Sequence, residues 1–442
     1  MTIATRIATC LFIASVAPVT LPSSALADFG APFPLMRAPS LTAPPSPGSG
    51  AALGVGPAID SLAASADGSV WLTDAQPSDA LGGRVRLSIR TSAGRLLTTR
   101  SFRPPGGAAV LSTAVAAVGS GATIAWTARR GGLLTVQMAR CSVARCQRPV
   151  TVRAAQTGAG ANSANSVVRL VTHDRGTLVV WTEPDGFAHW RADDRGHGAR
   201  TGVLGSSVAE LSLVSRPGGG AYAAWRSAGY SIRATQWDSN GKRGATATIG
   251  EGIQPHLAAG RGAVALSWRG RGSESRGVFA VYGEFGPGMV ATAPTVAGLR
   301  GRGVQLTQRS TVSPAVASSA DGRIVAAGWD FSGDRGGPAS LIAARGNLGS
   351  ATLSATPVDA QPKLYDSPPL AVAMDANGNG TVAWIRQGSL TVARTTGVSG
   401  FGVPMTIRAV GLATASIVSA TGPVTVAVGR SANAYFGVIA DR

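Results

Sequence analysis

A short β-type run that ends in tryptophan recurs along most of the chain, and this repeat constrains the fold more than any other feature. The runs are rich in Val, Ala and Thr, as in Thr-Leu-Val-Val-Trp181 and Gly-Thr-Val-Ala-Trp384. Seven copies end at Trp71, Trp126, Trp181, Trp225, Trp268, Trp329 and Trp384, and an eighth, residues 424–428, has Val in place of Trp. Successive copies are 43 to 61 residues apart. A period near 50 with β character is typical of a β-propeller or a β-solenoid.

Each unit divides into four short strands. A small apolar strand leads to a tight turn such as Asp67-Gly68 or Asp321-Gly322, which is a hairpin signal. The second strand ends at the tryptophan, and a variable loop, a third strand, a Gly-rich turn and a fourth strand follow. Helix signals are absent beyond the N-terminal segment. We therefore predict an all-β fold, a β-propeller of eight four-stranded blades, with seven blades as the alternative.

The N-terminal segment is predicted to complete the eighth blade. That unit ends with its third strand, residues 435–440, so its outer strand must come from elsewhere, because an open edge would template aggregation. Residues 29–38 (Phe-Gly-Ala-Pro and onward) resemble the fourth strand of unit seven, residues 401–409. We expect residues 28–38 to form a closing strand, 39–56 a linker and 57–442 the eight repeats. The alternative is a disordered N-terminal tail.

Residues 1–27 have the pattern of a secretory signal peptide. A short segment with one positive charge precedes an apolar stretch of about fifteen residues, and Ala25-Leu26-Ala27 is a small-x-small cleavage site. We expect cleavage, an uncleaved anchor being the alternative, and a mature single propeller domain of residues 28–442. The predicted location is secreted or associated with the cell envelope, with no transmembrane segment after cleavage.

Cleavage would leave two cysteines, Cys141 and Cys146. An even pair in an exported chain indicates a disulfide. The two residues flank a short turn between strand-like segments, so the bond would join the two ends of a hairpin. A redox or metal-binding pair is the alternative.

The repeat resembles that of exported bacterial β-propeller proteins that are grouped loosely with sialidase-like propellers. The resemblance rests on the Pro-Ala-Val start at Pro314, the Asp321-Gly322 turn and Trp329, and it covers nearly the whole mature chain. It implies the propeller fold. The chain differs from true sialidases because it has no Ser-x-Asp-x-Gly-x-Thr-Trp box; the nearest string, residues 65–71, is one residue short.

Charge is concentrated in arginine. The chain has 40 Lys and Arg against 22 Asp and Glu, a net charge of +18. The loops after the second strands should gather on one rim of a propeller, and besides Asp74 and Asp79 they carry the residues we predict to bind a ligand: Arg129, Arg130, Arg226, Arg269, Arg271, Arg386 and Arg430. Arginine suits planar, bidentate recognition of carboxylate, sulfate or phosphate. The alternative is a solvated basic rim with no ligand.

Signals for catalysis are weak. The chain has no Gly-x-Ser-x-Gly, His-Glu-x-x-His or phosphate-binding loop. A propeller glycosidase needs two carboxylates about 5–10 Å apart, and the candidates are Glu183, Asp185, Asp330 and Asp334, with Tyr230 as a sialidase-like nucleophile if an acid stands beside it. We interpret residues 189–197 as a polar turn and residues 375–380 as an Asx-type turn rather than metal sites, and we expect no cofactor and no metal.

The leading functional hypothesis is an exported, non-enzymatic β-propeller that binds an anionic glycan, a cell-envelope polymer or a protein partner through the Arg-bearing rim. The alternative is a sialidase-like glycan hydrolase or lyase that acts on the same face. We expect a monomer and no specific binding of nucleic acid, because the arginines are not interleaved with aromatic residues.

Overall fold

The computed structural model describes residues 33–37 and most of residues 59–440. Within the second range the undescribed positions are 66, 80–81, 92–93, 158–165, 174–175, 195–197, 272–284, 294, 300–303, 308–309, 332–337, 349–352, 362–369, 376, 387–388, 396–399, 408–413, 420–424 and 431–433. The predicted signal peptide (1–27) and linker (39–56) therefore lie outside the described residues.

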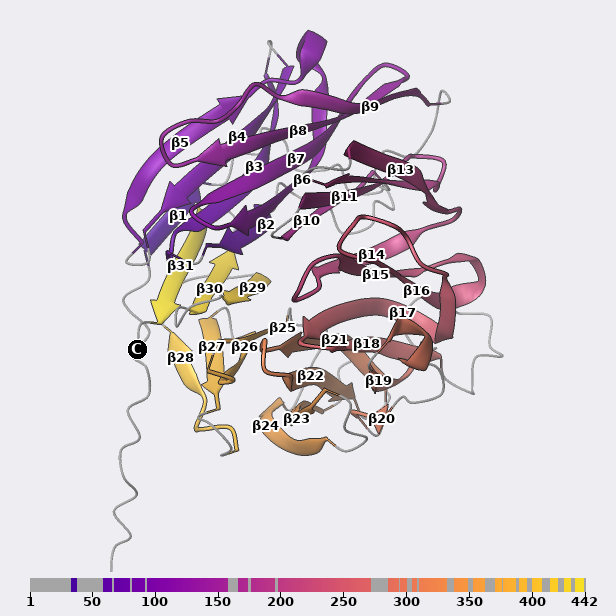
Figure 1. Ribbon diagram of the computed structural model, residues 1–442. Coiled ribbons are helices and arrows are strands. Elements are labelled where there is room, and N and C mark those ends of the chain that lie inside the picture. Colours follow the sequence, from indigo (N-terminus) through magenta and orange to yellow (C-terminus); the bar gives the residue numbers. More distant parts are fainter. Residues whose placement is uncertain are drawn as a thin grey trace, which may run out of the picture.

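The fold is all-β, as predicted, and its strands form antiparallel sheets (Figure 1). The first sheet holds β2 (Ile59–Ala64), β3 (Val70–Asp79), β4 (Gly82–Arg90) and β5 (Leu96–Phe102). The second holds β6 (Ala109–Val118), β7 (Gly121–Arg130), β8 (Leu133–Ser142) and β9 (Val150–Gln156). The third holds β10 (Val168–His173), β11 (Gly176–Thr182), β12 (Ala188–Asp194) and β13 (Gly198–Gly205).

The next sheet has seven strands, because β17 belongs to two consecutive units. It holds β14 (Ala209–Ser215), β15 (Ala221–Arg226), β16 (Ser231–Trp237), β17 (Ala247–Gly260), β18 (Ala263–Arg271), β19 (Phe285–Ala293) and β20 (Val304–Gln305). The first part of β17 pairs with β16, and its second part, from Gly252 to Gly260, pairs with β18. One 14-residue strand thus serves as the last strand of one unit and the first strand of the next.

Two further sheets follow the four-strand order. They hold β21 (Ser310–Ser318), β22 (Arg323–Phe331), β23 (Ala339–Asn347) and β24 (Ser354–Gln361), then β25 (Leu370–Met374), β26 (Gly380–Arg386), β27 (Ser389–Arg394) and β28 (Met405–Ile407). Three short 3-10 turns lie between strands: η1 (Pro105–Gly107), η3 (Ala228–Tyr230) and η4 (Val296–Leu299).

The last sheet combines the two ends of the chain. Its strands are β29 (Thr414–Ser419), β30 (Thr425–Arg430), β31 (Ala434–Ala440) and the N-terminal β1 (Phe33–Arg37). Strand β1 is antiparallel to β31, with Phe33 opposite Gly437 and Arg37 opposite Ala434. Figure 1 shows this sheet beside the one that begins with β2.

The first strands of consecutive units contact one another in a circuit. Contacts run from β2 to β6, β10, β14, the second part of β17, β21, β25 and β29, and β29 also contacts β2. The sheets are therefore arranged as propeller blades around the strands that begin each unit (Figure 1). In a blade of this topology, the loop after the second strand and the link to the next blade lie on one face, and the remaining turns lie on the other.

All seven repeat tryptophans are buried, as predicted for residues that fill space between blades. Each belongs to an apolar cluster that joins two neighbouring units. The tryptophans do not all face the same neighbour, however. Trp126 and Trp384 pack toward the preceding sheet, whereas Trp71 and Trp329 pack toward the following one. The interfaces after the first and the sixth unit consequently hold two tryptophans each.

The Asp-Gly signals mark hairpin turns, as predicted. In the β2–β3 turn, the Ser65 amide donates to Ser69 and the Gly68 amide donates to Ser65, both at 2.9 Å. The β21–β22 turn repeats this pattern around Ser319 and Gly322. The fourth residue of each turn has a positive φ, 82° at Gly68 and 94° at Gly322, which glycine tolerates without a Cβ penalty.

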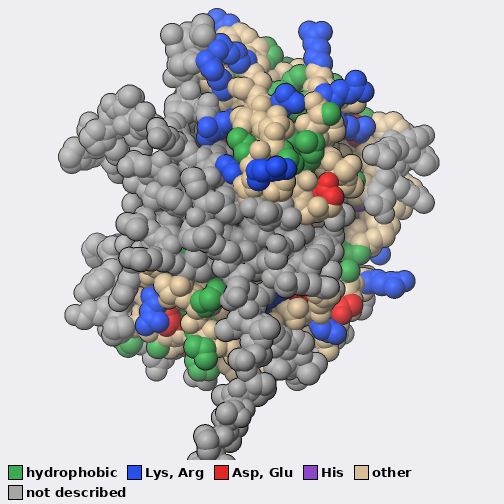
Figure 2. All heavy atoms as spheres, turned by 90° about the vertical axis from the view of Figure 1, so that its left-hand side faces the viewer, with side chains coloured by type: hydrophobic (Ala, Val, Ile, Leu, Met, Phe, Trp, Pro, Cys, Tyr) green, Lys and Arg blue, Asp and Glu red, His purple; other side chains and the backbone are tan. Residues whose placement is uncertain are grey.

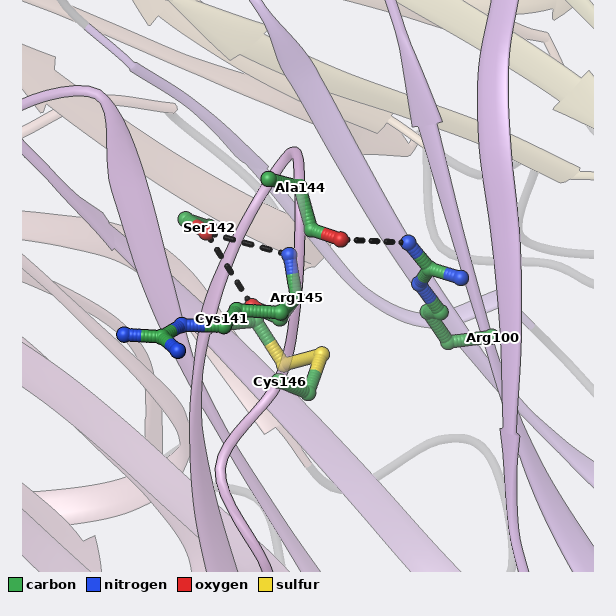
Figure 3. Close-up of a disulfide and its surroundings, with 6 residues drawn as sticks. All are labelled: Arg100, Cys141, Ser142, Ala144, Arg145 and Cys146. Atoms are coloured by element: carbon green, nitrogen blue, oxygen red, sulfur yellow. Dashed lines mark hydrogen bonds between the residues drawn. A yellow bond between two sulfur atoms is a disulfide. The ribbon is translucent and has the colours of Figure 1, made fainter.

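The predicted disulfide is present between Cys141 and Cys146, whose Cα atoms are 4.0 Å apart (Figure 3). It joins the end of β8 to the link that leads to β9. The Ser142 hydroxyl donates to the Arg145 carbonyl at 3.1 Å, and Arg100 of β5 donates to the Ala144 carbonyl at 2.8 Å. The bond therefore lies on the face opposite the loops that carry the predicted arginine rim.

We expect removal of residues 29–38 to lower the melting midpoint of the whole protein by about 5 °C or more, because it would unpair the edge of β31. Differential scanning calorimetry and light scattering of the truncated mature protein measure this. An unchanged midpoint with a monodisperse sample would show that β1 contributes nothing to stability.

We expect reduction of purified, exported protein to raise its intact mass by about 2 Da, since one disulfide takes up two hydrogens. The pair Cys141→Ser and Cys146→Ser should cost only ~1–3 kcal/mol of unfolding free energy, because the bond closes a short loop. Denaturant unfolding provides the second measurement. Two titratable thiols per chain in the untreated protein would contradict the first expectation.

Candidate functional site

The ends of the second strands carry arginines, as the sequence analysis placed them. Arg130, Arg226, Arg271, Arg386 and Arg430 are the last residues of β7, β15, β18, β26 and β30. These positions lie at the same end of their blades because the second strands run in the same direction. The side chain of Arg430 lies outside the described part of the chain.

Two predicted loop residues lie within strands instead. Arg269 is only 6% exposed inside β18, and burial lowers the pKa of its guanidinium to about 10. Asp74 is buried in β3, where Arg86 donates to both of its carboxylate oxygens at 2.9 and 3.0 Å. The second strands extend past the positions at which the sequence suggested that they end, so neither residue faces a rim ligand.

Three of the rim arginines, Arg226, Arg271 and Arg386, are paired with carboxylates. Arg226 Nε lies 3.0 Å from Glu210 Oε2, and Arg271 NH1 lies 3.4 Å from Glu251 Oε2. Arg386 NH1 lies 3.2 Å from Asp359 Oδ1. Most of this rim is therefore less positive than the arginine count suggests. Arg129 instead donates to the carbonyl of Gly131 at 3.0 Å, and Arg130 lies exposed beside Gly106 of the link between β5 and β6.

Two of these arginines converge on one tyrosine. The guanidinium carbons of Arg226 and Arg271 each lie 5.7 Å from the centroid of the Tyr230 ring, within cation–π range. Tyr230 is 40% exposed at the tip of the β15–β16 hairpin, and Arg271 reaches it from the neighbouring unit. We call the surface formed by Tyr230, Arg226, Arg271, Glu210 and Glu251 the Tyr230 surface.

The backbone around this surface is strained. The non-glycine residues with positive φ in the described part of the chain are Ser207, Glu210, Tyr230 and Gln254, with φ between 51° and 64°. Tyr230 lies in the β15–β16 turn, Ser207 in the link before β14, Glu210 at the start of β14 and Gln254 within β17. Such conformations cost about 1–3 kcal/mol each and are common at binding sites. Two of these residues are hydrogen-bonded to each other, because Glu210 Oε2 accepts from the Gln254 amide at 2.8 Å. The same oxygen also accepts a hydrogen bond from Arg226.

The carboxylates nominated as catalytic residues are dispersed. Glu183 follows β11 and lies 3.4 Å from both Arg153 and His189, and the His189 ring stacks on Trp181. Asp185 accepts a hydrogen bond from the Phe187 amide at 3.0 Å within the same loop.

Asp330 belongs to β22, three units further along the chain, and Asp334 lies outside the described residues. The described structure does not bring these acids together. The acids beside Tyr230 are Glu210 and Glu251, which the sequence analysis did not select. The sequence signal that could have selected them is the scarcity of glutamate, since the chain has only five glutamates.

In the two segments with metal-capable side chains, carboxylates accept hydrogen bonds from other groups of the protein. Asp375 accepts hydrogen bonds from the amides of Asn377 and Asn379 at 2.9 Å, an Asx-type turn as predicted, and Arg394 donates to its second oxygen at 2.8 Å. In the other segment, Arg191 donates to Asp193 at 2.8 Å. Within the described ranges, no three His, Cys, Asp or Glu side chains form a group that could hold a metal ion.

One face of the molecule shows the excess of basic residues directly. On the face in Figure 2, Lys and Arg side chains outnumber Asp and Glu over the described residues. Among those residues, none of the helices has both the length and the apolar character needed to cross a bilayer.

No protein-family model and no curated protein sequence matches the chain. Similar solved structures include the BP39L lectin from Burkholderia pseudomallei, with 14% identity, a TM-score of 0.46 and coverage of 78% of this chain and 98% of that one. The Cps50 (Swd1) β-propeller domain from Myceliophteria thermophila has 9% identity, a TM-score of 0.40 and coverage of 84% and 93%. A puromycin hydrolase has 14% identity, a TM-score of 0.43 and coverage of 80% and 53%. Similarities at this level carry no argument about what this chain binds.

We expect Tyr230→Gly to be more stable than Tyr230→Ala by about 1 kcal/mol, because both lose the ring but only glycine adopts a φ of 64° without strain. Urea unfolding of the two variants measures the difference. Equal stabilities would mean that the loop relaxes and that the strain is not imposed by the surrounding structure.

Proposed function

We propose that this chain is an exported binding protein that holds an anionic saccharide on the Tyr230 surface. The observation that carries this proposal is the half-exposed ring of Tyr230 between two guanidinium groups, each kept in place by a carboxylate.

The chemistry of the Tyr230 surface suits a sugar. An aromatic ring with one polar end can pack against the apolar face of a pyranose while its hydroxyl remains in water. Arginine and glutamate together supply donors and acceptors for hydroxyl groups, and guanidinium groups favour a carboxylate or sulfate substituent. Glu210 bonds to Arg226 and to the backbone of Gln254, so part of this arrangement is set before a ligand arrives.

The basic character of the chain supports an anionic ligand. A net charge of +18 raises the rate at which polyanions approach, even where individual arginines are ion-paired. The partner that fits these features is an anionic polysaccharide or another anionic polymer of the cell envelope.

The scaffold we propose is a single exported domain of eight blades closed by β1. Three observations support it: the circuit of contacts among the first strands of the units, the pairing of β1 with β31, and the sharing of β17 between two units. The signal-peptide pattern and the Cys141–Cys146 disulfide support export to an oxidising compartment.

A hydrolase or lyase on the same surface has less support. The acids near Tyr230, namely Glu210 and Glu251, are each bound by an arginine. Of the acids nominated from the sequence, Glu183 and Asp185 share one loop of the third unit, whereas Asp330 lies in β22 of the sixth. The binding experiment below detects catalysis as well, since cleavage of the polymer would release new reducing ends.

We expect the mature protein to bind dextran sulfate or polygalacturonate but not neutral dextran, and to lose affinity as salt rises from 50 to 200 mM, because screening weakens contacts between arginine and anions. Tyr230→Ala and Arg271→Ala should each weaken binding about tenfold, or ~1.4 kcal/mol. Isothermal titration calorimetry at both salt concentrations measures these effects.

Arg386→Ala is the matched control. Arg386 resembles Arg271 in charge, in having a carboxylate partner and in the 45% exposure of its side chain, but it is remote from Tyr230. It should change affinity less than twofold. If Arg386→Ala weakens binding as much as Arg271→Ala, binding follows net charge and the Tyr230 surface is not the site.

A further inference from the structure

A second site lies on the opposite face, between the sheets of β21–β24 and β25–β28. A cavity of about 280 Å³ opens there between the end of β23 and the β25–β26 turn. Its lining includes Arg323, Arg345, Asn347, Ser354, Thr356 and Phe401. Two guanidinium groups therefore border one cavity, and no acidic residue lines it among the residues that the structure describes.

Arg323 is held in position by both sheets. It begins β22, and its NH1 group donates to the Asn377 carbonyl of the next unit at 3.0 Å. Its Nε lies 3.2 Å from Asp321, which is outside the cavity lining. The side chain also lies against Gly378, where an added Cβ would come within 2.5 Å of Arg323 Cδ. The glycine turn of one blade thus makes room for the arginine of its neighbour.

Arg345 faces the same space from β23. It is half-buried, and burial lowers the pKa of its guanidinium, which the positive charge of Arg323 lowers further. Two like charges that influence each other at the wall of a cavity are costly, and an anion between them would remove that cost. The exposed Ser354 and Thr356 hydroxyls add neutral hydrogen-bond donors at the cavity.

A smaller cavity occupies a similar place between the second and third units. Its volume is about 170 Å³, and its lining includes Arg140, His173, Thr123 and Thr177. It has one guanidinium group instead of two. The convergence of two arginines is therefore a property of the later interface and not a general result of blade packing.

We propose that the cavity lined by Arg323 and Arg345 binds a tetrahedral oxyanion, the phosphate or sulfate group of an esterified ligand. Two guanidinium groups and two hydroxyls can together reach several oxygens of such a group, and arginine binds phosphate oxygens in pairs. The volume is below the range of about 300–1,000 Å³ common for drug-sized ligands, which favours a small charged group. This site is separate from the Tyr230 surface, and neither proposal depends on the other.

The test uses the full mature protein with phenyl phosphate and phenyl sulfate as probes, and calorimetry at low salt as the readout. We expect one site per chain in the wild type and at least tenfold weaker binding in Arg323→Ala and in Arg345→Ala. Arg345→Lys keeps the charge but loses the planar guanidinium group, so its affinity for the probes should lie between those of the wild type and Arg345→Ala. Phenyl phosphate should bind more tightly at pH 8 than at pH 5, because its second pKa is near 6, whereas phenyl sulfate should not change.

Two controls make the outcome decisive. Arg95→Ala removes an exposed arginine from the same face, in the β4–β5 turn, and should leave the affinity within twofold of the wild type. Tyr230→Ala should also leave it unchanged, which separates this site from the proposed saccharide surface. Equal losses in Arg95→Ala and Arg345→Ala, or no binding of either probe to a wild type with a normal melting midpoint, would overturn the proposal.

Discussion

Burial of apolar surface between adjacent sheets is the constraint on which the rest of this structure depends. Each four-stranded unit has two apolar faces and cannot cover either face by itself. Clusters such as the one that joins Trp329 of β22 to Trp384 of β26 cover both neighbours at once, and a buried tryptophan contributes on the order of a few kcal/mol. Because this requirement applies to every unit, the first and the last must also find partners, which explains why the two ends of the chain meet in one sheet.

The repeat and its turns could be predicted from sequence because their causes are local. Asp-Gly turns need a residue with positive φ, and the second strands are continuous runs of small apolar residues. The face that each tryptophan occupies was harder to predict, because side chains alternate along a strand and one residue of offset exchanges the two faces. Trp71 lies two residues after Ser69, the last residue of its turn, and Trp329 lies six residues after Arg323, so both offsets are even. Trp384 lies five residues after Asn379, an odd offset. This difference accounts for their packing in opposite directions.

The Tyr230 surface could be predicted only in part. Arg226 and Arg271 were visible as residues at the ends of second strands, and Tyr230 as a residue of the loop that follows Arg226. Glu210 and Glu251 were not, because they come from a first and a last strand and meet those arginines only when β14 pairs with β15 and β17 pairs with β18. A charge count cannot show such pairing. It also cannot show that a strand continues far enough to bury an arginine, as β18 does with Arg269.

Part of the strain at the Tyr230 surface, that at Gln254, lies in the strand that two units share. Where other units are joined by a loop, β17 continues from one sheet into the next, and its pairing register shifts between Ile253 and His256. A register shift leaves a residue outside the regular ladder, and here that residue, Gln254, has a φ of 55°. Its amide is therefore available to Glu210, which in turn holds Arg226 beside Tyr230. The irregular part of β17 thus supplies one of the hydrogen bonds that hold Glu210, the carboxylate on which the proposed binding surface depends.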